Sequence, residues 1–223
     1  MNQSLNNETS IQDQSPAIVV VIGRQFGSGG RRIGRKVADL LGIEYYDTEL
    51  ISEAAERLGY AKEIFVAHDE KKPNALWALL QGAYGIADNF HDVGICGERM
   101  YTEQSRAIRD ICSRKSCVVV GRTADFILRD NPRLISVFLH SPLDNRALSI
   151  VKRGEAESVA EAMEMARKKD KERESYYNYY TGGNDWGKAA NYDLTVDSSN
   201  LTEDEVANLI VSYTKKKIEK IGK

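Results

Sequence analysis

AIVVVIGRQFGSGGRR, residues Ala17 to Arg32, is the stretch of sequence that decides the fold. Residues 17–22 are apolar and mostly β-branched, which is typical of a parallel strand that is covered on both faces. An amphipathic helix is expected over residues 32–41, with Gly42 at its end. A buried strand, a glycine-rich turn and a helix start, in this order, direct backbone N–H groups and a helix dipole at one anion. The stretch therefore predicts a phosphate-binding loop.

Four glycines and a serine give this loop its character. Glycine permits positive φ angles and a close approach of the backbone to a ligand, at a cost of about 1 kcal/mol relative to alanine where it serves no purpose. We expect the loop to bind the phosphates of a nucleotide through Gly23, Gly27, Ser28, Gly29 and Gly30.

The loop departs from the common pattern G-x-x-x-x-G-K-[ST], in which lysine reaches the β/γ-phosphates and the hydroxyl binds magnesium. Gly23 and Gly27 to Gly29 match it, but Gly30 and Arg31 stand where the lysine and the hydroxyl are expected. A charge-assisted hydrogen bond contributes about 1.5–3 kcal/mol, so loss of the cation would damage catalysis. Arg31, Arg32 or Arg24 is expected to replace it, because guanidinium groups bind phosphate bidentately. The alternative is that these arginines only cover the helix surface.

Composition indicates an ordinary single α/β domain of 223 residues, 42% hydrophobic and 29% charged. With 31 basic and 33 acidic residues the net charge is −2, which argues against binding to a nucleic acid polymer or an anionic membrane. We expect residues 1–16 to form a disordered polar tail and residues 17–223 a single cytoplasmic domain. The spacing of the cysteines and histidines predicts no metal ligands.

Strand and helix patterns alternate along the rest of the chain, which predicts a parallel sheet. Residues 61–95 are hard to interpret and could form an insertion that covers a substrate. Further strands are expected at residues 43–46, 117–120, 134–139 and 194–196. Helices are expected to begin near Thr48, at about Gly97, at Ser141 as the N-cap, at Ser158 with Glu161 in a capping box, and at Thr202 with Glu205 in a second one.

The helix after Ser158 changes character along its length. Its apolar face fades after Ala166, and residues 167–174 are all charged, so this half either projects into solvent or closes over an anion. A turn is expected over residues 176–183. Its tyrosines and Trp186 are expected to pack rather than to stack on a base.

Several short motifs in this order resemble the nucleoside monophosphate kinases, and most closely the cytidylate kinase-like family of P-loop proteins, over residues 17–215. The resemblance rests on Gly-Ser-Gly-Gly after the first strand, Tyr45-Tyr46-Asp47 after the second, Val119-Val120-Gly121-Arg122 after the third, Arg146 and Arg153, Asp170 with Arg173, and Tyr192-Asp193-Leu194. Each motif falls at a strand end or on a charged helix, where such a kinase binds its substrates.

The resemblance implies a P-loop NTPase fold with three α/β/α layers, a five-stranded parallel sheet and a helical lid at about residues 153–183. It also implies transfer of a phosphoryl group from ATP, with Mg²⁺, to a nucleoside monophosphate, and CMP or dCMP is the first guess. Cytidylate kinases have Gly-Arg-Asp where this chain has Gly121-Arg122-Thr123. A kinase of another small phosphate acceptor therefore remains open.

Phosphoryl transfer requires positioning and charge neutralisation, which suggests roles for charged residues near the loop. Asp47 would bind magnesium, activate the acceptor phosphate or contact its sugar, or else only cap the helix from Thr48. Arg122 would bind the acceptor phosphate or pair with a surface carboxylate. The lid would bring cations to the transferred group from Arg146, Arg153, Lys169 and Arg173.

A solvated charged face is the alternative for those lid residues. Asp170 would orient Arg173 or merely stabilise its helix. The catalytic candidates are thus Arg31, Arg32, Asp47, Arg153, Asp170 and Arg173.

Two other functions remain open. Without the lysine, the protein could be a nucleotide-binding sensor that transfers phosphate slowly or not at all. A dinucleotide-binding oxidoreductase also begins with strand, glycine turn and helix, and Asp47 would then contact the ribose. The pattern G-x-G-x-x-G is not met, however, because with Gly27 and Gly29 as its first two glycines the third glycine position is Arg32.

Overall fold

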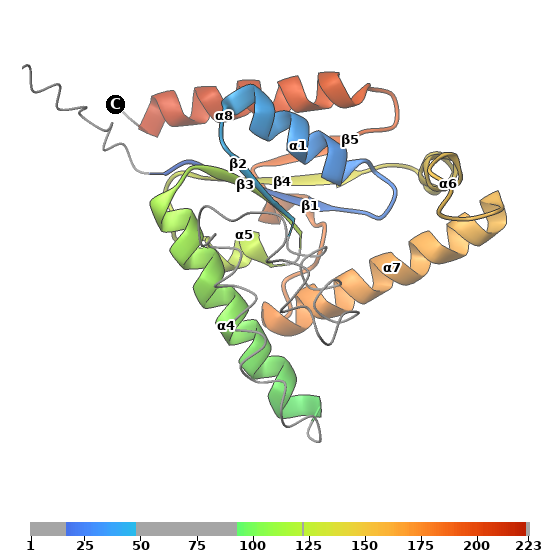
Figure 1. The fold of residues 1–223 in the computed structure, drawn as a ribbon, viewed down its shortest axis with the longest axis horizontal. Helices are drawn as coiled ribbons and strands as arrows, with labels where there is room; N and C mark the ends of the chain where they lie inside the picture. The colour runs from blue at the N-terminus through green and yellow to red at the C-terminus, as the bar shows by residue number, and fades with distance from the viewer. Residues whose placement is uncertain (1–16, 48–92, 122, 222–223) are drawn as a thin grey trace, which may run out of the picture.

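A computed structural model describes residues 17–47, 93–121 and 123–221 of the chain. These residues form one sheet with the strand order β2-β3-β1-β4-β5, and every pairing in it is parallel (Figure 1). The predicted five-stranded parallel sheet is confirmed. The strands are β1 Val19–Arg24, β2 Glu44–Asp47, β3 Cys117–Val120, β4 Leu134–His140 and β5 Leu194–Asp197.

Helices cover both faces of this sheet, which confirms the three α/β/α layers. The helices α1 (Gly30–Leu41) and α8 (Glu203–Ile221) lie on one face, and α4 (Val93–Arg114) and α5 (Ala124–Ile127) lie on the other (Figure 1). The remaining helices follow β4: α6 Leu143–Lys152, α7 Val159–Tyr180 and the short 3₁₀ helix η2 Ala189–Asn191.

The central strand β1 divides the core into two halves. All six of its residues are buried. Val20 and Ile22 belong to the cluster that packs under α1 and α8, whereas Val19 and Val21 belong to the cluster that packs against α4 and α5. Alternate side chains of a strand point to opposite faces, so an unbroken apolar run is needed when both faces are covered.

The loop after β1 is shorter than its glycines suggest. β1 continues through Gly23 and Arg24, because these residues pair with Phe138 and Leu139 of β4, and α1 already begins at Gly30. Of the four loop glycines, Gly27 and Gly29 have positive φ angles, of 89° and 84°. Gly23 serves packing instead, since a Cβ atom there would lie 3.0 Å from the ring of Phe138.

The capping box of Thr202 and Glu205 is confirmed, Ser158 is confirmed as an N-cap although the Glu161 side chain accepts from the Glu157 N–H, and the predicted N-cap at Ser141 is wrong. The Ser158 hydroxyl accepts from the Glu161 N–H at 3.2 Å, and the Thr202 hydroxyl accepts from the Glu205 N–H at 3.3 Å. Ser141 does not cap α6, because the Pro142 carbonyl accepts the first helical hydrogen bond, from Arg146 N–H at 3.1 Å. Ser141 instead connects the phosphate loop to α6 through its backbone.

The expected turn over residues 176–183 is wrong in its first half, because α7 continues to Tyr180. Aromatic packing supports this extension, with the Tyr180 ring stacked on Tyr101 of α4 at a centroid distance of 4.0 Å. Tyr177 is buried and donates its hydroxyl to Asp125 of α5 at 2.7 Å. Tertiary contacts thus stabilise a helix end that local sequence does not indicate.

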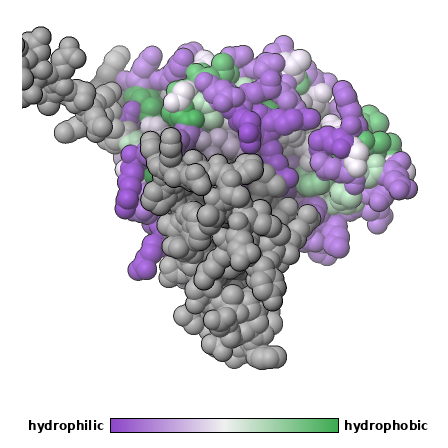
Figure 2. Space-filling view, viewed as in Figure 1, coloured by the Kyte–Doolittle hydropathy of each residue, from purple (hydrophilic) through white to green (hydrophobic). Residues whose placement is uncertain are grey.

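Hydrophilic side chains dominate the described surface in the view of Figure 2, and apolar residues show there only in small groups. None of the helices in the described ranges has the length and apolarity that crossing a membrane requires.

A substitution at Gly34 of α1 tests how closely this helix packs on the sheet. A Cβ atom there would lie 2.6 Å from Val120 Cγ2, so a side chain would push α1 away from β3. We expect Gly34→Ala to lower the free energy of unfolding by about 1–3 kcal/mol, although alanine gains about 1 kcal/mol in helix propensity. Urea denaturation measures this, with Asp39→Ala at an exposed position of α1 as control. Equal stability of the two variants would contradict the close contact.

Candidate active site

An arginine-rich cleft lies where β1 ends and α1 begins. Its volume is about 140 Å³. A site that encloses a whole ligand usually has about 300–1,000 Å³, so this part of the site suits phosphate groups rather than a base. One carboxylate, Glu155, lines it together with five arginines: Arg24, Arg31, Arg32, Arg153 and Arg173. Arginines therefore outnumber carboxylates in the cleft lining, although the whole chain carries a net charge of −2.

The backbone at the cleft is arranged for an anion. Gly29 caps α1 in the left-handed conformation, and within the described residues no side chain caps this helix and no acidic residue occupies its first turn. The first N–H groups of a helix have no partner inside the helix, and the dipole adds positive potential there. The start of α1 is thus suited to hold phosphate.

Gly27 allows α6 to lie directly beneath the loop. Its φ angle is 89°, and a Cβ atom there would lie 2.9 Å from Arg146 Cβ and 3.0 Å from the Arg146 carbonyl oxygen. Both the backbone angle and the contact exclude other residues. The loop therefore rests on α6.

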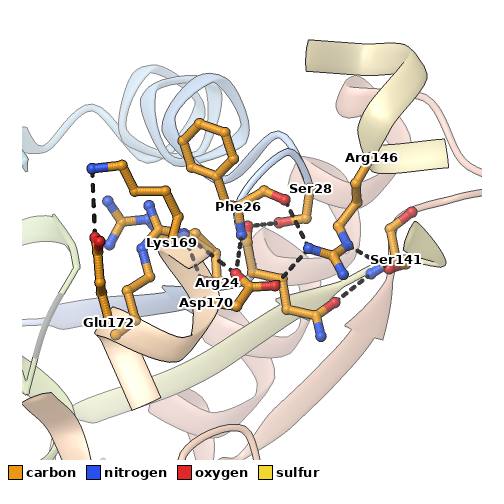
Figure 3. Close-up of polar contacts among 10 residues, drawn as sticks. Arg24, Phe26, Ser28, Ser141, Arg146, Lys169, Asp170 and Glu172 are labelled. Atoms are coloured by element: carbon orange, nitrogen blue, oxygen red, sulfur yellow. Dashed lines mark hydrogen bonds and ion pairs between the residues drawn. The ribbon is translucent and has the colours of Figure 1, made fainter. Parts of the chain in front are cut away.

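Arg146 and Asp170 fasten the loop to α6 and α7 (Figure 3). The Asp170 carboxylate accepts from the Phe26 N–H at 2.7 Å and from Arg146 Nη1 at 2.6 Å. Arg146 also donates to the carbonyl oxygens of Phe26, at 3.0 Å, and Ser141, at 2.9 Å. Burial raises the pKa of Asp170, against the opposing effects of the Phe26 amide and Arg146. Arg146 is 6% exposed and does not belong to the cleft lining, so its predicted phosphate contact stays a prediction.

The charged half of α7 faces the loop on one side and solvent on the other. Arg173 donates Nη1 to the Arg24 carbonyl oxygen at 3.2 Å, and its guanidinium lies 5.4 Å from the centre of the Phe26 ring. Lys169 pairs with Glu172 at 3.7 Å, and both of these side chains are exposed. One face of this charged stretch therefore lies against the phosphate loop and the other faces solvent, and closure over an anion stays a prediction.

Asp47 joins the end of β2 to the loop arginines. Its carboxylate is 5% exposed and accepts from Arg31 Nε at 2.9 Å, and Arg24 Nη2 lies at 3.8 Å. The Tyr45 hydroxyl lies 3.4 Å from the same carboxylate, and burial raises the pKa of Tyr45 to about 12. Residue Thr48, where the helix that Asp47 was expected to cap would begin, lies outside the described residues.

The other candidates take different places. Arg32 is 53% exposed and pairs with Glu203 of α8 at 2.6 Å, while Arg153 pairs with Glu155 through two contacts of 2.7 and 3.1 Å. Arg122 lies outside the described residues.

The Ser28 side chain is used within the loop. Its hydroxyl is buried and donates to the Gln25 carbonyl oxygen at 2.9 Å. The Ser28 carbonyl in turn accepts from the Ser198 hydroxyl at 3.0 Å, which links the loop to the segment after β5.

Sequence reasoning missed three residues that shape the site. Gln25 accepts the Ser141 N–H at 3.1 Å through its side chain, Phe26 meets Asp170 through its backbone, and Glu203 pairs with Arg32. Glu203 follows the predicted capping residue Thr202, so the sequence already indicated that it lies at the start of a helix. The other two contacts join residues more than 100 positions apart, and no local pattern signals them.

Magnesium does not fit the described residues as a protein-only site. No group of three His, Cys, Asp or Glu within the described ranges is arranged to hold a metal ion. Arg31 replaces the usual hydroxyl, and Asp47 and Glu155 are both paired with arginines. Mg²⁺ usually keeps several waters and binds through substrate phosphates with one or two carboxylates. The ion suits this site as part of a nucleotide complex.

The comparison with known families decides which class of protein this is. The chain matches the model of the cytidylate kinase-like family over residues 19–200. The chain belongs to the cytidylate kinase-like family. A curated relative, the cytidylate kinase of Methanosarcina barkeri, is 25% identical over 187 residues, which cover 82% of this chain and 89% of the relative.

Solved structures agree with this fold. An uncharacterised protein from Eubacterium ventriosum is 29% identical, with a TM-score of 0.65 and coverage of 89% of this chain and 98% of the other. A gluconokinase from Sinorhizobium meliloti has a TM-score of 0.51 at 14% identity, covering 92% and 95%. A shikimate kinase from Acinetobacter baumannii has a TM-score of 0.50 at 17% identity, covering 90% and 94%. Membership of the cytidylate kinase-like family supports phosphoryl transfer as the class of reaction.

Removal of Arg146 tests the fastening of the loop. Arg146→Met would remove the nearer cation of the Asp170 carboxylate and leave only Arg173 Nη1, at 4.0 Å, and breaking a buried pair costs about 3–5 kcal/mol. We expect a loss of this size in urea denaturation, together with weaker ATP binding in calorimetry. Arg167→Met makes the same chemical change at an exposed position of α7 and serves as control. Equal stability of both variants would contradict a supporting role for Arg146.

Asp125 provides a test of the contact between α5 and α7. Burial raises the pKa of Asp125 from 3.8 to about 6. Between these values the folded state binds more protons than the unfolded state, so the Asp125 contribution to stability is present at low pH and is lost as pH rises through about 6.

We expect the stability of the natural protein relative to Asp125→Asn to fall by about 2 kcal/mol between pH 4.5 and 7.5. Urea denaturation at both pH values measures this difference. The exposed Asp130→Asn is the control and should show no such dependence. A difference that does not change with pH would refute the burial effect at Asp125.

Proposed function

We propose that the protein transfers the γ-phosphoryl group of ATP to a nucleoside monophosphate, with CMP or dCMP as the first acceptor to test. The observation that carries this proposal is the phosphate-sized cleft between the start of α1 and five arginines. The cytidylate kinase relative supports the choice of acceptor. ATP, as its magnesium complex, would be the donor.

The reaction itself asks little covalent chemistry of the protein. An oxygen of the acceptor phosphate forms a bond to the γ-phosphorus, and the bond from that phosphorus to the β,γ-bridging oxygen breaks. The electron pair stays on the departing ADP, so the products are ADP and a nucleoside diphosphate. The protein's part is to align the two phosphates and to stabilise negative charge on the transferred group.

The cleft residues suit this task. In the proposal the N–H groups from Gly27 to Arg31 hold the β- and γ-phosphates at the positive end of α1. Arg153 and Arg173 contact the transferred group from the lid side, at residues 153–183, and exclude water. Mg²⁺ would neutralise phosphate charge between donor and protein.

Other residues would act by positioning. Asp170 and Arg146 hold the loop backbone, and Asp47 orients Arg31 through its 2.9 Å contact. Arg122, which lies outside the described residues, would bind the acceptor phosphate. Arg32 lies at the rim of the cleft and pairs with Glu203.

Another small phosphate acceptor is the second candidate, and Thr123 favours it. This residue stands where cytidylate kinases have the aspartate of Gly-Arg-Asp, and it is 1% exposed. A buried threonine does not provide the carboxylate that such kinases present to their substrate. A nucleotide sensor is the third candidate, because the loop has neither lysine nor magnesium-binding hydroxyl. Family membership gives the dinucleotide-binding alternative no support.

Acceptor-dependent ADP release tests the proposal. Pure protein is incubated with ATP, MgCl₂ and each of CMP, dCMP, UMP, AMP and GMP, and ADP is measured by a coupled assay. We expect CMP or dCMP to give the largest stimulation. Shikimate and gluconate serve as unrelated acceptors.

Arg173→Ala should then lower kcat by about 10- to 100-fold through loss of a charge-assisted contact, whereas the exposed Arg167→Ala should not. Stimulation by none of the nucleotides would contradict the proposed function. Calorimetric ATP binding without any turnover would favour the sensor.

A further inference from the structure

Arg24 and Gly30 face each other across the phosphate loop. A Cβ atom on Gly30 would lie 2.9 Å from Arg24 Cβ, 2.7 Å from its Cγ and 3.4 Å from its Cδ. The aliphatic part of Arg24 therefore occupies the space that the first carbons of any side chain at position 30 would need. Gly30 is the first residue of α1 and is not among the glycines with a positive φ angle, so this contact is what requires glycine there.

An alignment of the loop with the common phosphate-loop pattern explains this contact. In G-x-x-x-x-G-K-[ST] the first glycine stands five residues before the glycine that precedes the lysine. With Gly29 as the second glycine, the lysine position is Gly30 and the first glycine position is Arg24. The match of Gly23 to the first glycine is therefore wrong, because Gly23 is one residue too early and lies inside β1. The chain thus has a long cation where the pattern has glycine, and glycine where the pattern has the cation.

The burial of Arg24 distinguishes it from the neighbouring arginines. Arg24 is 5% exposed and still lines the cleft, and Asp47 lies 3.8 Å from its Nη2. The Arg31 side chain is 40% exposed, and Arg32 is 53% exposed and directed to Glu203 of α8. A side chain held by burial loses less conformational entropy on binding a ligand than an exposed one.

We propose that Arg24 supplies the cation that phosphate loops usually take from lysine, and that Arg24 and Gly30 are a paired exchange of side chains across the loop. The inference deepens the proposed kinase function and rests on it. The Arg24 guanidinium contacts the β- and γ-phosphates of ATP. It stabilises the charge that gathers there as the bond to the bridging oxygen breaks.

The exchange predicts mutual rescue between the two positions. Arg24→Ala should weaken ATP binding by about 10- to 100-fold. The affinity for AMP, a nucleotide without the β- and γ-phosphates, should change by less than about threefold. Gly30→Lys should also weaken ATP binding, because lysine collides with the Arg24 side chain. Arg24→Gly combined with Gly30→Lys restores the first glycine and the lysine of the pattern, although Arg31 stays in the hydroxyl position, and should bind ATP at least about tenfold more tightly than Arg24→Gly alone.

The measurement is calorimetric affinity for ATP and AMP, with urea denaturation to show that each variant is folded. The matched control is Arg35→Ala, which removes a positive charge from an exposed position of α1, the helix that begins at Gly30. Unchanged ATP affinity in Arg24→Ala would overturn the proposal, and so would equal weakening of ATP and AMP, which indicates a structural role. A double variant no better than Arg24→Gly would also overturn it.

These outcomes are independent of the acceptor assay. If the natural protein binds ATP but phosphorylates none of the acceptors, the proposed kinase function fails while the affinities still decide the role of Arg24. If the natural protein is an active kinase and Arg24→Ala keeps full ATP affinity and kcat, only the role of Arg24 fails.

Discussion

A single carboxylate, that of Asp170, holds the phosphate loop in place. It accepts the Phe26 N–H and pairs with Arg146, which also donates to the carbonyl oxygens of Phe26 and Ser141. Asp170 comes from α7 and Arg146 from α6, so two helices far along the chain fix the backbone that would hold the phosphates. A buried pair of this kind is costly to break, which makes the shape of the loop dependent on α6 and α7.

The cleft concentrates positive charge without leaving it uncompensated. Three of its arginines have a carboxylate within 3 Å: Arg31 with Asp47, Arg32 with Glu203 and Arg153 with Glu155. These pairs place the guanidinium groups around the loop, where like charges alone would repel each other. A bound triphosphate would share or take over these cations. Because the acids come from β2, α8 and the segment after α6, a filled cleft would connect most of the domain.

Local patterns in the sequence predicted a parallel sheet with a covered central strand, and the family resemblance implied the three layers, but neither indicated where each element ends. The apolar run after Ala17 predicts a covered central strand because both of its faces must be buried. Its end at Arg24 depends on pairing with β4, and the end of α7 at Tyr180 depends on a tyrosine stacked from α4. Such pairings join residues distant in sequence, so short-range periodicity does not report them.

The sequence by itself determined that an anion-binding loop lies between a buried strand and a helix, because glycine spacing and apolar periodicity act locally. It also carried the family resemblance that the comparisons confirm. The tertiary structure alone decided which loop residues meet. In the folded loop the Arg24 side chain occupies the space that a side chain at position 30 would need. The sequence does not indicate this contact, because it depends on the three-dimensional path of the loop.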